Sequence, residues 1–373
     1  MYRQQIYVAS EEYKELDTYI TNNNCRTILL VCDRALPFLR LGRYFESLES
    51  RLNVKVVKFD DFEPNPVYES IVDGVDRFHK EKCDSIIAVG GGSAIDVAKC
   101  IKLFSNMDRK ENFLKQTIVP NDIKLLAIPT TAGTGSESTH FAVIYYEGEK
   151  QSVSDDSCIP SSVLFDVSTL DTLSDYQRKS TMMDALCHAM EAYWSINSTE
   201  ESRQYSHEAI TNILTNKDAY LKNNIEGNAA MLMAANLAGK AINIAQTTAG
   251  HALCYKLTCL YGIAHGHAAA LCVSKLFPFM VTNMDQCIEP RGKEFLEKVF
   301  LNIANAMGCS NVVLAINKFD EILNELNLEI PIPKEGDYNI LNTSVNSIRL
   351  KNNPIKLDEN MIDNLYHQIL AER

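Results

Sequence analysis

The sequence predicts an α/β domain built on a parallel sheet, followed by an all-helical domain. In the first part of the chain, short apolar runs such as 26–32 alternate with segments of helical apolar spacing. This alternation is typical of βαβ units and a parallel sheet. After about Leu170 strand-like runs nearly vanish, and long helical patterns such as 228–260 replace them. The expected domains are residues 1–168 and 169–373.

Four strands are expected in the first domain. Their patterns cover 26–32, 53–59, 84–90 and 122–130. Between the second and third of them, apolar residues recur with the helical period, at Ile71, Val72, Val75 and Phe78. Ligands of parallel sheets bind at the carboxyl ends of the strands. The loops that follow these strands are therefore the first places in which to look for a binding site.

The composition excludes several classes of protein. At 373 residues, 46% hydrophobic and 23% charged, the chain is long enough for two globular domains. Its formal net charge of −12 argues against a nucleic-acid partner. There is no apolar run long enough to span a membrane, and the N-terminus lacks the pattern of a signal peptide. The 11 cysteines occur singly, without a CxxC pair, which favours reduced thiols and a cytoplasmic protein.

A glycine-rich turn joins the third expected strand to a helix. The segment "AVGGGSAIDVAK" spans residues 88–99. Glycines allow close approach of the backbone to a phosphate, and the N–H groups of a helix N-terminus favour an anion. Gly91, Gly92 and Ser93 are therefore candidate phosphate contacts. Taken alone, the turn fits a tight strand-to-helix connection equally well.

A second polar loop and an aspartate extend this candidate site. The segment "AIPTTAGTGSEST" (127–139) follows the fourth strand and offers Thr130, Thr131 and Thr134. Two such loops at one sheet edge favour a dinucleotide over a single phosphate. Asp33 follows the first strand, where a carboxylate binds the ribose hydroxyls of NAD(H) and repels the 2′-phosphate of NADP(H). Arg34 beside it keeps NADP(H) as an alternative.

Four residues of the second domain form a candidate metal site. Asp184 and His188 are four residues apart in "TMMDALCHAMEAYWS" and therefore share a helical face. His251 and His265 follow in a second histidine-containing segment. One carboxylate with three imidazoles suits Fe²⁺ or Zn²⁺ and not Mg²⁺ or Ca²⁺, which prefer oxygen ligands.

Taken together, these motifs resemble one family. "GGGSAIDVAK", "IPTTAGTGSE", "DALCHAMEAYWS" and the His-x13-His-Gly segment resemble, in this order and spacing, the iron-containing (group III) alcohol dehydrogenases. The resemblance implies a Rossmann-like domain, a helical domain of the dehydroquinate synthase-like fold, and NAD(P)-dependent interconversion of alcohols and aldehydes. It also implies the metal and phosphate contacts above, and it places Asp96 and Lys150 near the nicotinamide ribose.

Two departures from the family pattern concern the substrate. Tyr255 stands where many members carry a second histidine that relays a proton, and Arg178 and Lys179 precede the metal aspartate. The surrounding segments look most like the phosphonoacetaldehyde reductase branch, which forms 2-hydroxyethylphosphonate. That branch implies a cationic partner for a phosphonate, and the candidates are Arg178, Lys179 and His267. A solvated helix face is the alternative for Arg178 and Lys179.

Other functions remain open from the sequence. A general primary-alcohol or diol dehydrogenase of the lactaldehyde reductase type is the main alternative, and a dehydroquinate-synthase-like lyase shares the fold. A non-catalytic nucleotide-binding protein is a third possibility. We expect Fe²⁺, with Zn²⁺ as the alternative, NAD(H) in preference to NADP(H), and a homodimer or higher homo-oligomer.

Overall fold

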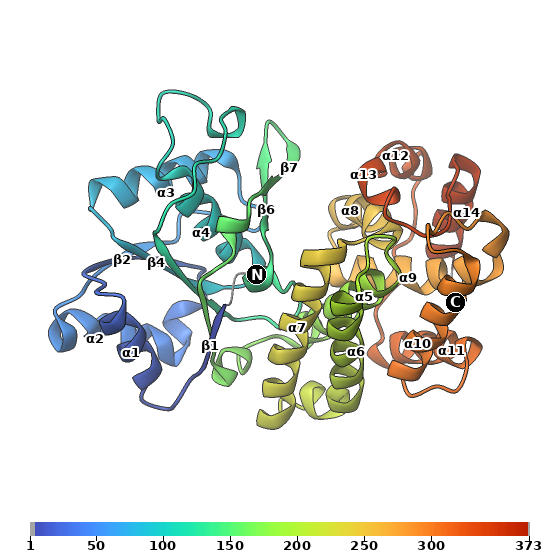
Figure 1. Ribbon diagram of the computed structural model, residues 1–373, viewed down its shortest axis with the longest axis horizontal. Coiled ribbons are helices and arrows are strands. Elements are labelled where there is room, and N and C mark those ends of the chain that lie inside the picture. The colour runs from blue at the N-terminus through green and yellow to red at the C-terminus, as the bar shows by residue number, and fades with distance from the viewer. Residues whose placement is uncertain (1–3, 372–373) are drawn as a thin grey trace. The chain divides into compact units, whose positions relative to one another are not determined.

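The computed structural model describes residues 4–371 and separates into two compact units (Figure 1). The first unit runs to Thr131 and resumes over Gly135–Leu173. The second unit contains Ala132–Thr134 and the chain from Ser174 onward. The first unit holds a parallel sheet and the second is helical, which confirms the predicted fold class. The units divide at residues 173 and 174, against an expected domain boundary at 168 and 169.

Six strands form one sheet in the first unit, in the order β1-β8-β5-β4-β2-β3, and all neighbours are parallel. The strands are β1 (Gln5–Val8), β2 (Thr27–Cys32), β3 (Lys55–Phe59), β4 (Ser85–Gly90), β5 (Lys124–Pro129) and β8 (Ser162–Phe165). A separate antiparallel hairpin joins β6 (Phe141–Tyr146) to β7 (Glu149–Ser154). The four expected strands are β2, β3, β4 and β5. The sequence analysis did not foresee β1, β8 or the hairpin.

Helices pack on both faces of this sheet. They are α1 (Lys14–Asn22), α2 (Arg40–Leu52), α3 (Tyr68–Lys80) and α4 (Gly92–Phe104). The short 3₁₀ helices of the unit are η1 (Leu36–Phe38), η2 (Phe113–Lys115), η3 (Ser136–Ser138), η4 (Asp156–Cys158) and η5 (Val167–Leu170). Side chains of α1 and α2 share one buried cluster with one face of the strands, and those of α3 and α4 share another with the opposite face. Burial on both faces explains why these strands read as continuous apolar runs.

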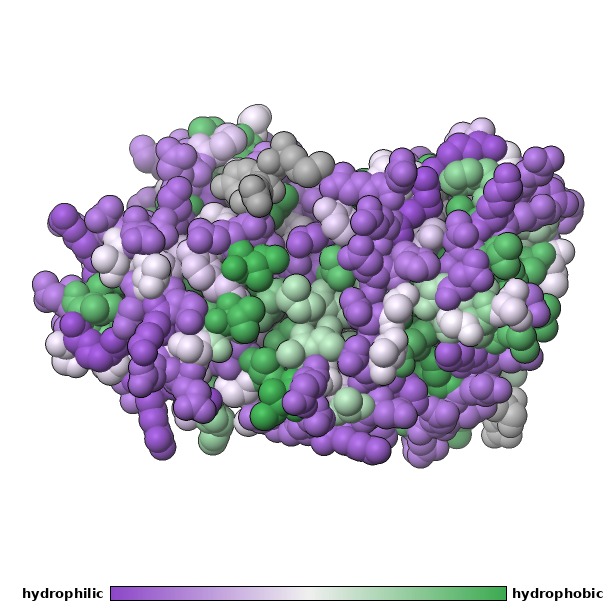
Figure 2. Space-filling view, turned by 60° about the horizontal axis from the view of Figure 1, so that its bottom comes forward, coloured by the Kyte–Doolittle hydropathy of each residue, from purple (hydrophilic) through white to green (hydrophobic). Residues whose placement is uncertain are grey.

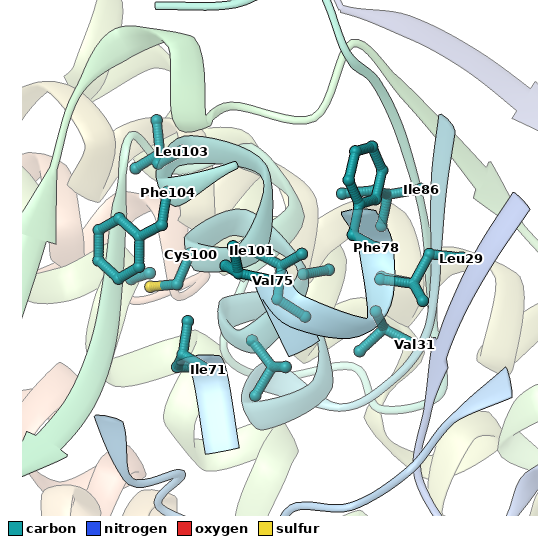
Figure 3. Close-up of a cluster of buried hydrophobic side chains, with 14 of the residues drawn as sticks. Leu29, Val31, Ile71, Val75, Phe78, Ile86, Cys100, Ile101, Leu103 and Phe104 are labelled. Carbon is teal, nitrogen blue, oxygen red and sulfur yellow. The ribbon is translucent and has the colours of Figure 1, made fainter. Parts of the chain in front are cut away.

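Figure 3 shows the second of these clusters. Leu29 and Ile86 project from the strands, Val75 and Phe78 from α3, and Phe104 from α4. All five side chains are at most 5% exposed. Burying a side chain of this size contributes about 1.5–3 kcal/mol to stability, so this face holds α4 firmly against the sheet.

The strand order creates a switch point between β2 and β4. The chain leaves β2 toward β3 on one side of the sheet, and it leaves β4 toward β5 on the other side. In sheets of this kind, ligands bind outside the carboxyl ends of the strands at such a point. The residues that follow β2 and β4 are Asp33 and the glycine-rich turn, so the fold places both expected cofactor elements there.

The second unit contains no strand among its described residues. Its longer helices are α5 (Asp175–Trp194), α6 (Glu200–Leu221), α7 (Ile225–Ala245), α8 (Ala249–Tyr261), α9 (His265–Thr282), α10 (Lys293–Ala306), α11 (Val312–Leu326) and α14 (Glu359–Ile369). The shorter ones are η6 (Met284–Gln286), α12 (Asp337–Thr343) and α13 (Ser347–Leu350). The helical pattern at 228–260 is divided between α7 and α8, because Gln246 adopts φ +61° and turns the chain.

Hydrophilic residues cover most of the face drawn in Figure 2. Hydrophobic residues lie between them in smaller groups. Among the residues that the structure describes, no helix combines the length and the apolar character that a membrane span requires.

Candidate functional site

The glycine-rich turn connects β4 directly to the N-terminus of α4. Gly91 precedes the first helical residue, Gly92, and no side chain caps this end of the helix. A Cβ atom on Gly90 would lie 2.5 Å from the Cβ of Ala94 and 3.0 Å from Oδ2 of Asp33. A larger residue at position 90 would therefore disturb the turn. The backbone N–H groups of the first turn of α4, including Ser93, remain the natural donors for an anion.

Asp33 lies against this turn. Its backbone N–H donates to the Val89 carbonyl at 3.3 Å, and its Oδ1 accepts a hydrogen bond from the Ala35 N–H at 2.9 Å. The carboxylate is therefore held at the switch point, as the sequence predicts. Arg34, which could instead bind the 2′-phosphate of NADP(H), forms an exposed ion pair with Glu63.

Asp96 has a different environment from the one expected. Its Oδ1 accepts a hydrogen bond from the Ser136 hydroxyl at 2.5 Å, and its Oδ2 accepts one from the Val143 N–H at 2.9 Å. Burial raises the pKa of Asp96, and the charge of Lys99, 3.9 Å away, opposes this. These contacts join α4 to η3 and β6.

Lys99 completes the same network and was missed by the sequence analysis. Its ammonium group is fully buried and donates to the Thr139 hydroxyl at 2.9 Å, the Phe141 carbonyl at 2.9 Å and the Ser136 hydroxyl at 3.2 Å. Buried lysines need such partners. Lys150, on the β7 strand of the hairpin, is near enough for its charge to act on Asp96.

The threonine-rich loop continues from β5. Thr130 is buried, and its N–H donates to the Gly90 carbonyl at 3.1 Å. The Thr131 side chain lies 3.4 Å from the position that a Cβ on Gly91 would take. Thr130 and Thr131 therefore flank the glycine-rich turn, as expected for cofactor contacts. Thr134 clusters with the helical unit instead.

Helix α5 presents the expected metal ligands of the second unit. The Ser174 side chain caps its N-terminus by accepting a hydrogen bond from the Gln177 N–H. Asp184 and His188 lie one turn apart and are buried. The start of α8 adds His251, also buried. One potential ligand atom from each of these three side chains lies within 4.8 Å of the other two, which is a suitable spacing for a shared ion.

Two polar atoms that face one another in this cluster lack hydrogen-bond partners among the described residues. They are the buried atoms Asp184 Oδ1 and His251 Nε2. His251 Nε2 lies 3.6 Å and His188 Nε2 4.0 Å from Asp184 Oδ1, which is beyond a hydrogen bond. Each unsatisfied buried group costs about 1–3 kcal/mol. A divalent cation would satisfy Asp184 Oδ1 and His251 Nε2, and His188 Nε2 lies near enough to Asp184 to join them, so the residues present fit a metal ion.

The electrostatics of Asp184 and His188 agree with this assignment. Burial would raise the pKa of Asp184, but the charge of His188 and the other histidines holds it well below its usual range. Burial lowers the pKa of His188, which favours the neutral imidazole that a metal needs. Asp184 thus remains an anionic ligand over the physiological pH range.

His265 lies beside the three-residue cluster. Its ring centroid is 5.2 Å from that of His251, and its charge helps to lower the pKa of Asp184. The glycine that follows it is required by packing, because a Cβ on Gly266 would lie 2.0 Å from the Ser180 carbonyl oxygen. The His-Gly pair thus lets α9 begin directly against α5. The structure therefore groups three of the four expected ligands at metal-binding spacing, with His265 beside them.

Glu191 supports His251 and was also missed by the sequence analysis. It lies on α5, fully buried, and its Oε2 is hydrogen-bonded to His251 Nδ1. Its Oε1 accepts hydrogen bonds from the Thr248 N–H at 2.9 Å and hydroxyl at 2.7 Å. Burial lowers the pKa of His251, but the charge of Glu191 outweighs it and raises that pKa to about 9. A carboxylate on Nδ1 orients the ring so that Nε2 faces the cluster.

Tyr255 and His267 are held by neighbouring side chains. The Tyr255 ring stacks on His265 at 5.7 Å between centroids, and burial raises the pKa of its hydroxyl well above the usual value. The Tyr176 hydroxyl accepts from the Ala264 N–H and is hydrogen-bonded to His267 Nδ1 at 3.0 Å. These bonds favour a role for His267 in positioning the start of α9 over contact with an anion.

Arg178 and Lys179, the two candidate phosphonate contacts on α5, both have partners within the protein. The Arg178 guanidinium is buried, donates to the side chains of Asn223 and Asn228 and to the Tyr220 carbonyl, and lies over the Tyr220 ring. This environment favours a structural role that ties α5 to the connection between α6 and α7. Lys179 forms an ion pair with Asp175 on its own helix at 2.6 Å.

The two units together define a class of protein. One carries a glycine-rich turn at the switch point of a parallel sheet, and the other carries a buried carboxylate–histidine cluster that fits a metal. Residues 4–167 match the family model of the iron-containing alcohol dehydrogenases, and residues 179–370 match the model of the C-terminal domain of the Fe-containing alcohol dehydrogenase family. The chain belongs to the iron-containing alcohol dehydrogenase family.

Curated relatives of different lengths share about 30% identity with the chain. An aldehyde-alcohol dehydrogenase of Streptococcus pneumoniae is 30% identical over 74% of this chain, which spans only 33% of that relative's length. The phosphonoacetaldehyde reductase of Streptomyces viridochromogenes is 31% identical over 61% of each chain. Alcohol dehydrogenase 4 of Saccharomyces cerevisiae is 30% identical over 88% of this chain and 86% of its own.

A solved structure shares the fold over the whole chain. The sulfoacetaldehyde reductase of Bifidobacterium kashiwanohense, crystallised with NAD⁺, aligns with a TM-score of 0.88 at 22% identity, covering 100% of this chain and 99% of that one. The likeness confirms the two-part architecture.

Proposed function

We propose that the protein is a metal-dependent aldehyde reductase that uses NAD(P)H. The observation that carries the proposal is the buried cluster of Asp184, His188 and His251, in which Asp184 Oδ1 and His251 Nε2 have no hydrogen-bond partner among the described residues. The donor set of one carboxylate and three imidazoles, with His265 as the fourth ligand, favours Fe²⁺, with Zn²⁺ as the alternative. A bound divalent cation supplies a Lewis acid that polarises the aldehyde carbonyl.

The reaction takes a hydride from the reduced nicotinamide and a proton from the medium or a side chain. An aldehyde, NAD(P)H and H⁺ give the primary alcohol and NAD(P)⁺. The stacking of Tyr255 on His265 makes its hydroxyl the candidate proton donor. Asp33 at the switch point supports NAD(H) as the preferred cofactor, and the turn at Gly91, Gly92 and Ser93 supports pyrophosphate binding.

Phosphonoacetaldehyde is the proposed substrate, with 2-hydroxyethylphosphonate as the product. The sequence of the metal helix and the match to a phosphonoacetaldehyde reductase support it. A neutral primary alcohol or diol is the second candidate, because the match to alcohol dehydrogenase 4 covers more of the chain.

A substrate panel tests the proposal. Protein freed of metal and reconstituted anaerobically with Fe²⁺ or Zn²⁺ would be assayed with NADH and NADPH against phosphonoacetaldehyde, lactaldehyde, glycolaldehyde and butyraldehyde. We expect metal-dependent turnover with the highest kcat/KM for phosphonoacetaldehyde and NADH. Equal turnover with and without metal would overturn the metal assignment. A higher kcat/KM for butyraldehyde than for phosphonoacetaldehyde would overturn the phosphonate reductase function and favour a general alcohol dehydrogenase.

A further inference from the structure

One cation of the helical unit lies close to the candidate metal cluster without belonging to it. Arg349 is on the short helix α13, which packs against α8. Its Nη1 donates to the Gln246 side chain at 3.0 Å, and its guanidinium is near enough for its charge to act on the Tyr255 hydroxyl. Gln246 therefore holds this arginine in place, and it remains partly exposed.

A chain of contacts links Arg349 to the metal ligands. Tyr255 stacks on His265 with their rings nearly parallel, 8° apart, and the His265 ring meets that of His251. The Arg349 guanidinium is thus separated from the proposed ligand His265 by the Tyr255 ring. Arg178, in contrast, is buried among the groups of α6 and α7, and Lys179 is paired on its own helix.

Guanidinium chemistry suits a tetrahedral oxyanion. Its five N–H donors form a planar fork that can bond Gln246 and two oxygens of a phosphonate or sulfonate. In a two-carbon aldehyde, the anionic group is attached to the carbon next to the carbonyl. When the carbonyl oxygen lies at the metal, the anion must therefore be met by a cation close to the metal ligands.

We propose that Arg349 binds the oxyanion of a short anionic aldehyde, a phosphonate or a sulfonate, and so selects it over neutral aldehydes. This inference rests on the proposed function and names the specificity residue of that site. Gln246 is its support: the side chain accepts from both Arg349 and Asn352 and so fixes the position of the guanidinium.

The first test compares substrates in variants of the metal-loaded enzyme. Arg349→Gln should lower kcat/KM for phosphonoacetaldehyde or sulfoacetaldehyde about tenfold or more, mainly through KM, and change glycolaldehyde less than about twofold. Arg349→Lys keeps the charge and should recover part of the loss. Lys351→Gln changes an exposed cation two residues after Arg349, is the matched control, and should leave the ratio of kcat/KM for anionic and neutral substrates unchanged. An equal loss on both substrate types in Arg349→Gln, or none, would overturn the proposal.

A binding measurement separates this inference from the proposed function. Calorimetric titration of the zinc-loaded protein with ethylphosphonate, ethanesulfonate and 1-propanol needs no turnover. The wild type should bind one or both anions, and Arg349→Gln should weaken that binding about tenfold while its metal content stays unchanged. Unchanged anion affinity would refute the role of Arg349 even if the enzyme reduces aldehydes. Loss of turnover with normal anion binding would instead count against the reductase function.

Discussion

The glycine-rich region of the first unit and the metal cluster of the second are built on opposite principles. In the first, the charged side chains satisfy one another: Asp96 and Lys99 are bonded to protein groups, and a ligand is left with backbone N–H groups. In the second, Asp184, His188 and His251 are buried with polar atoms that no described residue satisfies. A buried polar atom without a partner is costly. The second region therefore depends on its ligand, whereas the first is complete without one.

Removing a proposed metal ligand should have the largest effect of the changes considered, because the metal cluster depends on its ligand. His251→Ala should abolish metal binding and turnover while leaving the fold intact, because a missing ligand removes carbonyl polarisation worth several kcal/mol. Metal analysis and steady-state kinetics measure the two effects. His207→Ala on α6 removes an exposed histidine and is the control. Full metal content with wild-type turnover in His251→Ala would refute the ligand assignment.

Disrupting the Lys99–Asp96 network of the first unit should lower the free energy of unfolding. Lys99→Met removes three hydrogen bonds and leaves Asp96 without its buried cation, so we expect a loss of about 3–5 kcal/mol in the free energy of unfolding. Chemical denaturation measures it. Lys102→Met is the matched control, because Lys102 is also buried but donates to a single carbonyl, that of Asn121. An equal loss of unfolding free energy in the two variants would mean that the Lys99 network stabilises the protein no more than any other buried lysine does.

Glu191 tests whether the metal cluster needs its supporting carboxylate. Glu191→Gln keeps the size of the side chain but removes the charge that orients His251, and we expect metal affinity to fall about 10–100-fold. Competition with a chelator measures this affinity. Glu289→Gln also changes a buried carboxylate, but one that is paired with Arg291, and should leave metal affinity unchanged. If Glu191→Gln binds metal as tightly as wild type, the orienting role is wrong.

Cofactor preference is the smallest expected effect. Asp33→Asn keeps the acceptor for the Ala35 N–H but removes the charge, so the ratio of kcat/KM for NADH to that for NADPH should fall about tenfold. Asp60→Asn is the control, since Asp60 also follows a strand, β3, but pairs with Lys58. If the wild-type enzyme prefers NADPH, Asp33 does not bind the adenosine ribose hydroxyls.

The sequence foresaw the parts of the protein that local patterns encode. Buried parallel strands read as apolar runs, and β2, β3, β4 and β5 were predicted for that reason. The edge strand β1 was missed because it is only four residues long and mostly exposed. The hairpin was missed because Glu149–Ser154 is largely polar.

The candidate site was predictable to the extent that it follows from spacing. Asp184 and His188 share a helical face in any tertiary arrangement, and His251 and His265 were added from a second histidine-containing segment before the family resemblance supported all four. Glu191 continues the same face, three residues after His188, and this spacing was the available signal for it. The sequence could not show that its carboxylate meets His251, because the contact joins α5 to α8.

Sequence alone determined the fold class and the expected metal helix, since helical and strand periodicities act over a few residues. The tertiary structure decided which charged side chains could contact a substrate. Arg178 and Lys179 looked like substrate contacts because they precede Asp184, yet packing buries one and pairs the other. Arg349 lies 165 positions after Asp184 in the numbering and is brought toward the cluster by the packing of α13 on α8. Whether a charge is buried, paired or presented depends on its neighbours in space, and linear order does not contain them.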